Sequence, residues 1–131
     1  MKSKKEKTMQ QSSSNKWETI EIDHKIFSRN KIDRMHWALK SKLKNEYRIL
    51  IGNQMRVNKI KKTNNKCKIT IECHLKRLYD YDNVWGGLKQ FIDALCNEGF
   101  MWDDSSNWLV VDTVKQIKSK EEKIIVKRLE I

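Results

Sequence analysis

One stretch of strict alternation between apolar and polar residues constrains the fold more than any other part of the chain. Between residues 66 and 75 every second side chain is apolar, and the positions between them are polar or charged. The apolar set is Cys67, Ile69, Ile71, Cys73 and Leu75. Because successive side chains of a strand point to opposite faces, this pattern predicts a strand with one buried face. Other elements must cover that face.

Two helices are predicted, one on each side of this strand in the sequence. The first is indicated by apolar residues that recur at steps of four and three residues, namely Met35, Leu39, Leu43, Tyr47 and Leu50. The second covers about residues 83–97, where Asp82 or Asn83 suits the N-cap position. Gly99 fits the position just past the end of that helix.

Three further strands complete the predicted fold, over residues 17–23, 108–117 and 123–131. The order β-α-β-α-β-β implies one α/β (α+β) domain over residues 17–131, in which two main helices pack against a mixed sheet. Residues 1–16 carry five lysines and a Gln-Gln-Ser-Ser-Ser run. This segment has too little apolar surface to fold, so we expect a disordered basic arm.

The balance of charges favours an anionic partner. The chain has 28 Lys and Arg against 17 Asp and Glu, a formal net charge of +11, and the basic arm accounts for only +4 of it. Such a surface attracts phosphate polymers or anionic lipids, although a general preference for lysine in the composition would give the same count. A row of Lys40, Lys44 and Arg48 at helical spacing is either a solvated helix face or a ridge that follows phosphates.

Several classes of protein are excluded by the composition. No apolar run approaches the roughly 20 residues that a membrane span needs, and the N-terminus has no apolar signal segment. The absence of proline excludes collagen-like and Pro-rich chains. The cysteines, Cys67, Cys73 and Cys96, are odd in number and lack CxxC spacing, so we expect reduced, packed thiols in the cytoplasm, with no zinc site at Cys73-His74.

The most unusual acidic residues lie between positions 80 and 104. Asp80 and Asp82 follow directly on the alternating strand, and in extended chain residues two apart point to the same side. Two carboxylates held close together repel unless a cation lies between them. Mg²⁺ suits such a pair, because it binds one or two carboxylates and completes its shell with water and phosphate oxygens.

A second acidic pair, Asp103 and Asp104, precedes the next predicted strand. We expect the helix between the two pairs to bring them together in one pocket that holds a divalent cation. Lys76, Arg77 and Lys89 lie close by in the sequence and could neutralise phosphate charge. The simpler alternatives are an ordinary capped turn for the second pair and, for Lys89, an exposed lysine that pairs with an acid four residues on.

The residues from Arg77 to Asp104 resemble the signature of the RusA family of Holliday-junction resolvases, which are common in phages and prophages. That signature is a basic residue, then D-x-D-N, a lysine, D-A-L, a glycine and a final D-D. The resemblance is close over about 28 residues and, with the flanking strands, extends over about half of the chain. The interval from Asn83 to Lys89 is six residues, longer than in the shortest family form. Either the paired glycines start the helix late, or the lysine has a changed role.

The resemblance implies a Mg²⁺-dependent endonuclease, with Mn²⁺ as a substitute, that cuts four-way DNA junctions as a homodimer by paired nicks. By position, the metal-binding catalytic residues would be Asp80, Asp82 and Asp104, and Lys89 would contact phosphate. The supporting residues would be Asp103, Asn83 and Asp93. Phosphate contacts would come from Lys76, Arg77, Lys89, Lys40 and Lys44.

Two other readings of the sequence stay open. The chain could be a non-catalytic DNA-binding protein in which the acids are structural caps and the basic segments bind phosphate. It could also keep the nuclease chemistry and act on flaps or replication forks instead of four-way junctions.

Overall fold

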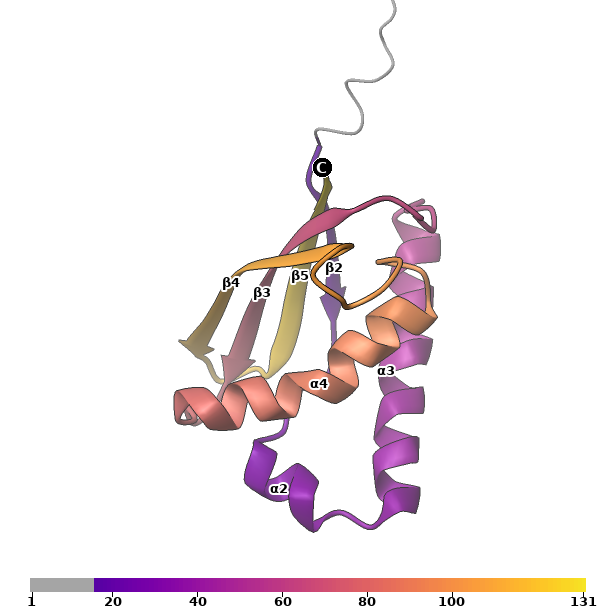
Figure 1. The fold of residues 1–131 in the computed structure, drawn as a ribbon. Helices are drawn as coiled ribbons and strands as arrows, with labels where there is room; N and C mark the ends of the chain where they lie inside the picture. The colour runs from indigo at the N-terminus through magenta and orange to yellow at the C-terminus, as the bar shows by residue number, and fades with distance from the viewer. Residues whose placement is uncertain (1–15) are drawn as a thin grey trace, which may run out of the picture.

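The computed structural model describes residues 16–131, which form a single α+β domain (Figure 1). Its elements in chain order are β2 (Glu18–Ile22), α2 (Arg29–Arg34), α3 (Trp37–Val57), β3 (Cys67–Leu75), α4 (Tyr81–Asn97), β4 (Leu109–Lys118) and β5 (Lys123–Glu130). The predicted basic arm lies outside the described residues, apart from Lys16. No helix within residues 16–131 is both long enough and apolar enough to cross a bilayer.

The sheet has four strands in the order β2-β5-β3-β4. β3 pairs with β4 in parallel and with β5 in antiparallel orientation, and β5 pairs antiparallel with β2, so the sheet is mixed as predicted. The connection from β3 to β4 runs through α4, as a parallel pair requires. β4 lies at one edge of the sheet, with a described neighbour on one side only.

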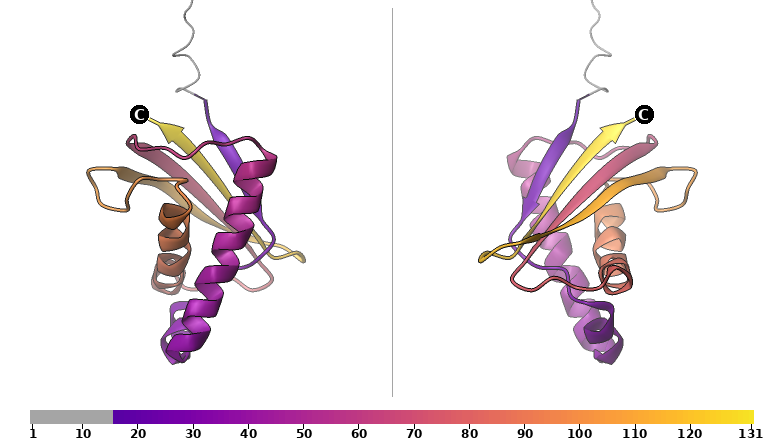
Figure 2. Two further views of the ribbon diagram at one scale, coloured as in Figure 1. Left: turned by 90° about the vertical axis from the view of Figure 1, so that its right-hand side faces the viewer. Right: turned by 90° about the vertical axis from the view of Figure 1, so that its left-hand side faces the viewer.

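The helices α3 and α4 cover one face of the sheet, and the core lies between them and that face (Figure 2). The predicted alternation of β3 is confirmed, since Cys67, Ile69, Ile71, Cys73 and Leu75 are all buried. At the centre the rings of Tyr47 on α3 and Phe91 on α4 meet edge to face, with centroids 5.2 Å apart. The opposite face of the sheet carries the polar positions of the same strands.

The cysteines are free thiols, and two of them are packing residues. Cys73 points into the core, and burial raises the pKa of its thiol to about 12. His74, the next residue of the strand, lies on the other face, where its ring nitrogen is 3.3 Å from a carboxylate oxygen of Glu72. Alternation therefore separates the two side chains that a zinc site at this position would have to share.

The short helix α2 was not predicted. The sequence indicated only a polar stretch there, because one turn and a half with a single buried apolar residue, Ile32, has no periodic pattern. The helix is capped instead by Ser28, whose hydroxyl accepts from the backbone N–H of Lys31 at 3.2 Å. His36 similarly caps α3 by accepting from the N–H of Ala38.

The predicted apolar stripe of α3 is confirmed except at Leu39. Leu43 and Tyr47 are buried, and Met35 and Leu50 are partly buried against the core, whereas the fully buried row continues through Ile51 and Met55. Leu39 is 54% exposed, because the first turns of α3 extend beyond the sheet (Figure 1). The fully buried residues are therefore spaced four apart. Because four residues make slightly more than one helical turn, this row shifts slowly around α3, as expected for a helix that crosses the sheet at an angle.

The start of α4 also differs from the prediction. The N-cap is Asp80, not Asp82 or Asn83, and the helix begins at Tyr81. The far end is as predicted: Gly99 follows the helix with a φ of +84°, a left-handed conformation that glycine adopts without strain.

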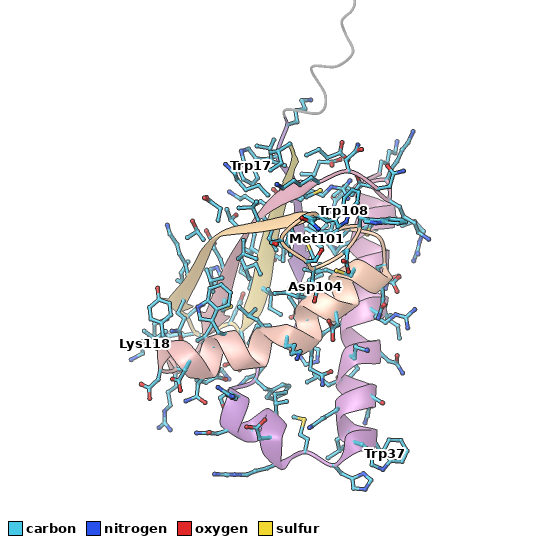
Figure 3. All side chains as sticks on the ribbon, in the orientation of Figure 1. Trp17, Trp37, Met101, Asp104, Trp108 and Lys118 are labelled. Atoms are coloured by element: carbon cyan, nitrogen blue, oxygen red, sulfur yellow. The ribbon has the colours of Figure 1, made fainter. Side chains whose placement is uncertain are left out.

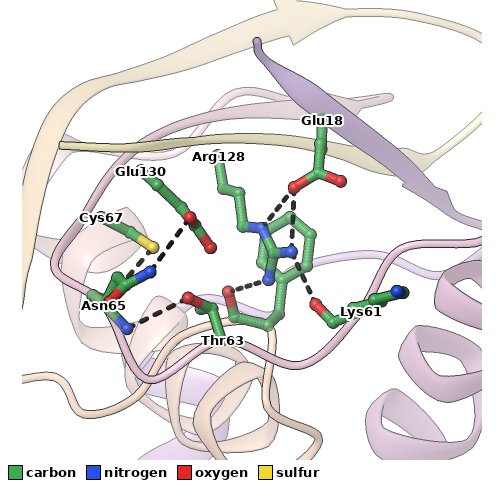
Figure 4. A network of polar contacts seen from close by, with 8 residues as sticks. Glu18, Lys61, Thr63, Asn65, Cys67, Arg128 and Glu130 are labelled. Atoms are coloured by element: carbon green, nitrogen blue, oxygen red, sulfur yellow. Dashed lines mark hydrogen bonds and ion pairs between the residues drawn. The ribbon is translucent and has the colours of Figure 1, made fainter. Parts of the chain in front are cut away.

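A buried arginine ties the strands to the two longest connections. Arg128 on β5 is only 2% exposed, and it donates to a carboxylate oxygen of Glu18 on β2 at 2.9 Å (Figure 4). It also donates to the carbonyl of Phe100 at 2.8 Å and to that of Lys61 at 2.6 Å. The guanidinium lies over the ring of Phe100, 4.9 Å from its centroid. One side chain thus satisfies acceptors from three separate segments.

We expect Arg128→Met to lower the free energy of unfolding by about 2–3 kcal/mol, because two backbone carbonyls lose a charged donor. Urea unfolding measures the change. The control is Lys127→Met, the exposed neighbour on β5, which should stay within about 0.5 kcal/mol of the wild type. Equal stability of the two variants would show that the Arg128 contacts contribute nothing.

Candidate functional site

The loop from β3 into α4 is fixed by hydrogen bonds on both sides. The backbone N–H and carbonyl of Tyr79 bond to the side-chain amide of Gln116 on β4, at 2.7 and 2.9 Å. The hydroxyl of Tyr79 donates to the carbonyl of Ile26 at 3.0 Å. Since Tyr79 immediately precedes the first acidic pair, these bonds determine where that pair lies.

Asp80 and Asp82 stand at the N-terminal end of α4 and are both exposed. The carbonyl of Asp80 accepts from the N–H of Val84 at 3.1 Å, while its carboxylate makes no capping hydrogen bond. Asp82 lies in the first helical turn, where the helix dipole favours negative charge. Both carboxylates are therefore held at a defined place with their oxygens available.

A groove of about 600 Å³ runs between α2, the start of α3 and α4; we refer to it as the α2–α4 groove. Six residues of α4 line it: Asp82, Trp85, Gly86, Lys89, Gln90 and Asp93. Its other lining residues include Arg29, Asp33 and Lys40. The groove thus contains several of the predicted site residues, in a setting of mixed charge.

The paired glycines explain how α2 comes so close to α4. A Cβ on Gly87 would lie 1.8 Å from the carbonyl oxygen of Phe27, and one on Gly86 would lie 2.6 Å from side-chain carbons of Arg29. Asn83 reinforces this contact, since its side-chain oxygen accepts from the N–H of Asn30 at 3.2 Å. Asn83 thus links α4 to α2, whereas its predicted supporting role in a metal site stays a prediction.

The start of α4 excludes one of the two explanations of the long interval before Lys89. The glycines do not start the helix late, because α4 begins at Tyr81 and includes both. Lys89 follows Asp82 by two turns, on the groove side of the helix, and its side chain is exposed. The simpler alternative, a pair between Lys89 and Asp93, is not observed: no ion pair within 4 Å joins Lys89 to any acid in the described part of the chain.

The second acidic pair lies beyond the other end of α4. Asp103 and Asp104 are exposed on the connection from α4 to β4 (Figure 3). That connection is anchored by the buried side chains of Phe100 and Met101. The pKa of the nearby Cys96 thiol is raised to about 12, first by burial and then by the negative charges of Asp104, Asp103 and Asp93. Asp93 on α4 therefore lies near Cys96, as the second acidic pair does.

The expected meeting of the two acidic pairs around one cation stays a prediction. Asp82 lies in the first turn of α4, and Asp104 lies on the connection after it, close enough to Cys96 in the last turn to raise the pKa of that thiol. Among residues 16–131 there is no group of three His, Cys, Asp or Glu side chains that could hold a metal ion. The described part of one chain therefore does not present a complete set of metal ligands.

The predicted phosphate-binding residues divide between two places. Lys76 and Arg77 are exposed just after β3, and the N–H of Lys76 donates to Glu122 at 3.1 Å. Lys40 lines the α2–α4 groove, and Lys44 follows it by one turn of α3. Sequence reasoning missed Arg29 and Asp33 in the groove, because both belong to the unpredicted helix α2, where they approach each other at 3.9 Å.

Comparison with known proteins adds no relative: no protein-family model matches the chain, and no curated protein matches it in sequence.

We expect Gly87→Ala to lower the free energy of unfolding by about 1–3 kcal/mol or more, because the new methyl group would overlap the backbone of Phe27. The control is Gly52→Ala on α3, where the methyl group would meet only the movable carboxylate of Glu98 at 3.0 Å and alanine favours the helix. Thermal unfolding of both variants measures the difference. A Gly87→Ala protein as stable as Gly52→Ala would contradict the close contact between α2 and α4.

Proposed function

We propose that this protein is a metal-dependent, structure-specific DNA endonuclease that acts as a homodimer on four-way junctions. The observation that carries the proposal is the pair of exposed carboxylates at the start of α4, Asp80 and Asp82, of which Asp82 lines a groove that also holds exposed cations. A net charge of +11 makes a polyanion the expected partner. The resemblance of residues 77–104 to RusA resolvases supplies the reaction and the junction substrate.

The separation of the acidic pairs supports a site shared between two copies of the chain. In a two-fold symmetric dimer, every contact occurs twice with the partners exchanged. If the two α4 helices lie antiparallel across the axis, Asp80 and Asp82 of one copy face Asp103 and Asp104 of the other, at both ends. Each dimer then has two equivalent acidic clusters. This arrangement would give each acidic cluster the ligands that the described part of one chain does not bring together.

Exposed aromatic side chains at both ends of α4 favour such a contact. Tyr81 and Trp85 near its start are 70% and 45% exposed. Trp102 and Trp108 beyond its end are 55% and 37% exposed and meet edge to face, with centroids 6.3 Å apart. Large aromatic residues are enriched in protein interfaces and rare on surfaces that stay in water. These aromatic residues lie next to the acidic residues with which the second copy would form each cluster.

The donor set fits a hard divalent cation, because Mg²⁺ takes carboxylate oxygens and keeps several waters and phosphate oxygens. Asp80, Asp82 and the partner's Asp104 would hold it. When bound, such an ion supplies Lewis-acid polarisation of the phosphate and a more acidic water. Lys89 lies two turns along the groove from Asp82, where its ammonium group can neutralise a phosphate next to the one being cut. Lys40 faces the same groove from α3.

One observation favours a second candidate, a DNA-binding protein without catalysis. No three-ligand metal group exists within the described part of one chain. If the chain stayed monomeric, Asp80 would be only the N-cap of α4, and the groove would bind phosphate through its cations.

We expect the wild type to cut a synthetic four-way junction in Mg²⁺ and to lose this activity in EDTA. Asp82→Asn should reduce cleavage at least about a hundredfold, since it removes a metal ligand. Asp23→Asn, an exposed acid elsewhere, is the control and should cut normally. Flaps, forks and linear duplexes of the same length identify the preferred substrate. Junction binding without any cutting in Mg²⁺ would favour the non-catalytic alternative.

A mixture of two inactive variants tests the shared site. Asp82→Asn and Asp104→Asn, refolded together, form mixed dimers in which one cluster loses both acids and the other keeps both. We therefore expect the mixture to recover nicking of one strand, although each variant alone is inactive. Failure of the mixture to recover any activity would contradict a site built from two copies.

A further inference from the structure

A second basic surface lies around the connection between α3 and β3, at the end of α3 opposite the α2–α4 groove. Four exposed lysines, Lys16, Lys59, Lys61 and Lys62, surround a hollow of about 260 Å³, which we call the basic hollow. Arg128 lies in its wall, together with Glu18 and Glu130. None of these lysines is among the phosphate contacts that the family resemblance implies.

The backbone that carries the lysines is held in place by the fold. The carbonyl of Lys61 accepts from the buried Arg128 at 2.6 Å, and the N–H of Thr63 donates to the carbonyl of Gly99 at 3.0 Å. Ile60, which precedes Lys61, is buried in the core. Lys59 has a φ of +56°, a left-handed conformation that a lysine adopts only where the surroundings impose it. The segment is therefore a rigid support and not a loose loop.

The two acids of the hollow already have partners. Glu18 pairs with Arg128 at 2.9 Å, and Glu130 accepts from the side chain of Asn65 at 3.2 Å. No ion pair within 4 Å involves any of the four lysines in the described part of the chain. Their mutual repulsion is thus left for a bound anion to offset.

A row of basic residues leads from the α2–α4 groove to the basic hollow along the seam between α3 and α4. Lys40 lines the groove, Lys44 follows one turn later, and Arg48 donates to Glu98 near the end of α4 at 2.8 Å. The side chain of Lys62 then packs beside Gly99. α3 is about 30 Å long, which equals about nine steps of a DNA strand at 3.4 Å each.

We infer that the basic hollow binds the phosphate backbone of a duplex DNA arm whose other end lies at the α2–α4 groove. The inference rests on the proposed function, since it extends the substrate of that site along the molecule. Both polar and exposed apolar residues lie close in the sequence to residues of the hollow, namely Asn58, Asn64 and Asn65 on the one hand and Trp17, Val57 and Ile131 on the other. We take double-stranded DNA as the ligand because the proposed function supplies that substrate, and an anionic bilayer is the outcome that the vesicle measurement below tests.

The test compares two variants, each of which loses three positive charges at a different place on the surface. One variant carries Lys59→Gln, Lys61→Gln and Lys62→Gln, which keep the aliphatic stems and leave the backbone bonds intact. The matched control carries Lys68→Gln, Lys115→Gln and Lys127→Gln on the sheet face that no described helix covers. Binding of a 20-base-pair duplex and of a four-way junction is measured in EDTA by fluorescence anisotropy over a range of salt concentrations.

We expect the hollow variant to bind duplex more than about tenfold more weakly than the control. Its slope of log affinity against log salt should be smaller by about two to three, because each lost phosphate contact removes nearly one. Glu130→Gln, which removes a negative charge from the hollow, should bind about twofold to fivefold more tightly than the wild type.

Equal binding and equal salt slopes of the two triple variants would overturn the inference. So would a preference of the wild type for phosphatidylserine vesicles over duplex that is lost only in the hollow variant. The outcome is independent of catalysis: absence of junction cutting in Mg²⁺ would overturn the proposed function, whereas the comparison of the triple variants in EDTA would still stand.

Discussion

The contact between Gly87 and the carbonyl of Phe27 is the constraint on which the candidate site depends. A side chain at position 87 would overlap the backbone of Phe27 before α2, and one at position 86 would meet the side chain of Arg29 at the start of α2. With glycines there, α2 packs on the first turns of α4, and the bond from Asn83 to Asn30 fixes its position. The groove exists because of this packing, and Arg29, Asp33 and Lys40 face Asp82 and Lys89 for the same reason.

The rigidity of α4 is the second constraint, and it decides which acids can cooperate. Asp80 and Asp82 precede or begin the helix, Asp93 lies three turns further along, and Asp103 and Asp104 follow its end. A helix of this length does not bend enough to bring its ends together. Within the described residues of one chain the acids form no group that could hold a metal ion, so a second chain is one way to complete such a group. A chemistry that needs only a pair of carboxylates beside cations can use one chain.

The sequence was sufficient to predict the sheet and the two long helices, because their side chains follow regular periods. Cys67 to Leu75 alternate without exception, and all five predicted apolar positions are buried. The helix α2 has a single buried residue and no period, so only the cap at Ser28 could have indicated it. The stripe of α3 failed at Leu39 because burial depends on where the sheet ends, and a periodic pattern contains no such information.

Predictions about the site had a different limit. Helical spacing correctly places Asp82, Lys89 and Asp93 on one face of α4, since that relation is local. Whether Asp104 returns to Asp82 depends on the direction of a connection, which local spacing does not determine. The glycine pair could have indicated the groove, because two glycines inside a helix cost stability unless another segment packs closely against them. Here the backbone of residue 27 does so, and the acidic and basic residues of the groove are arranged around that contact.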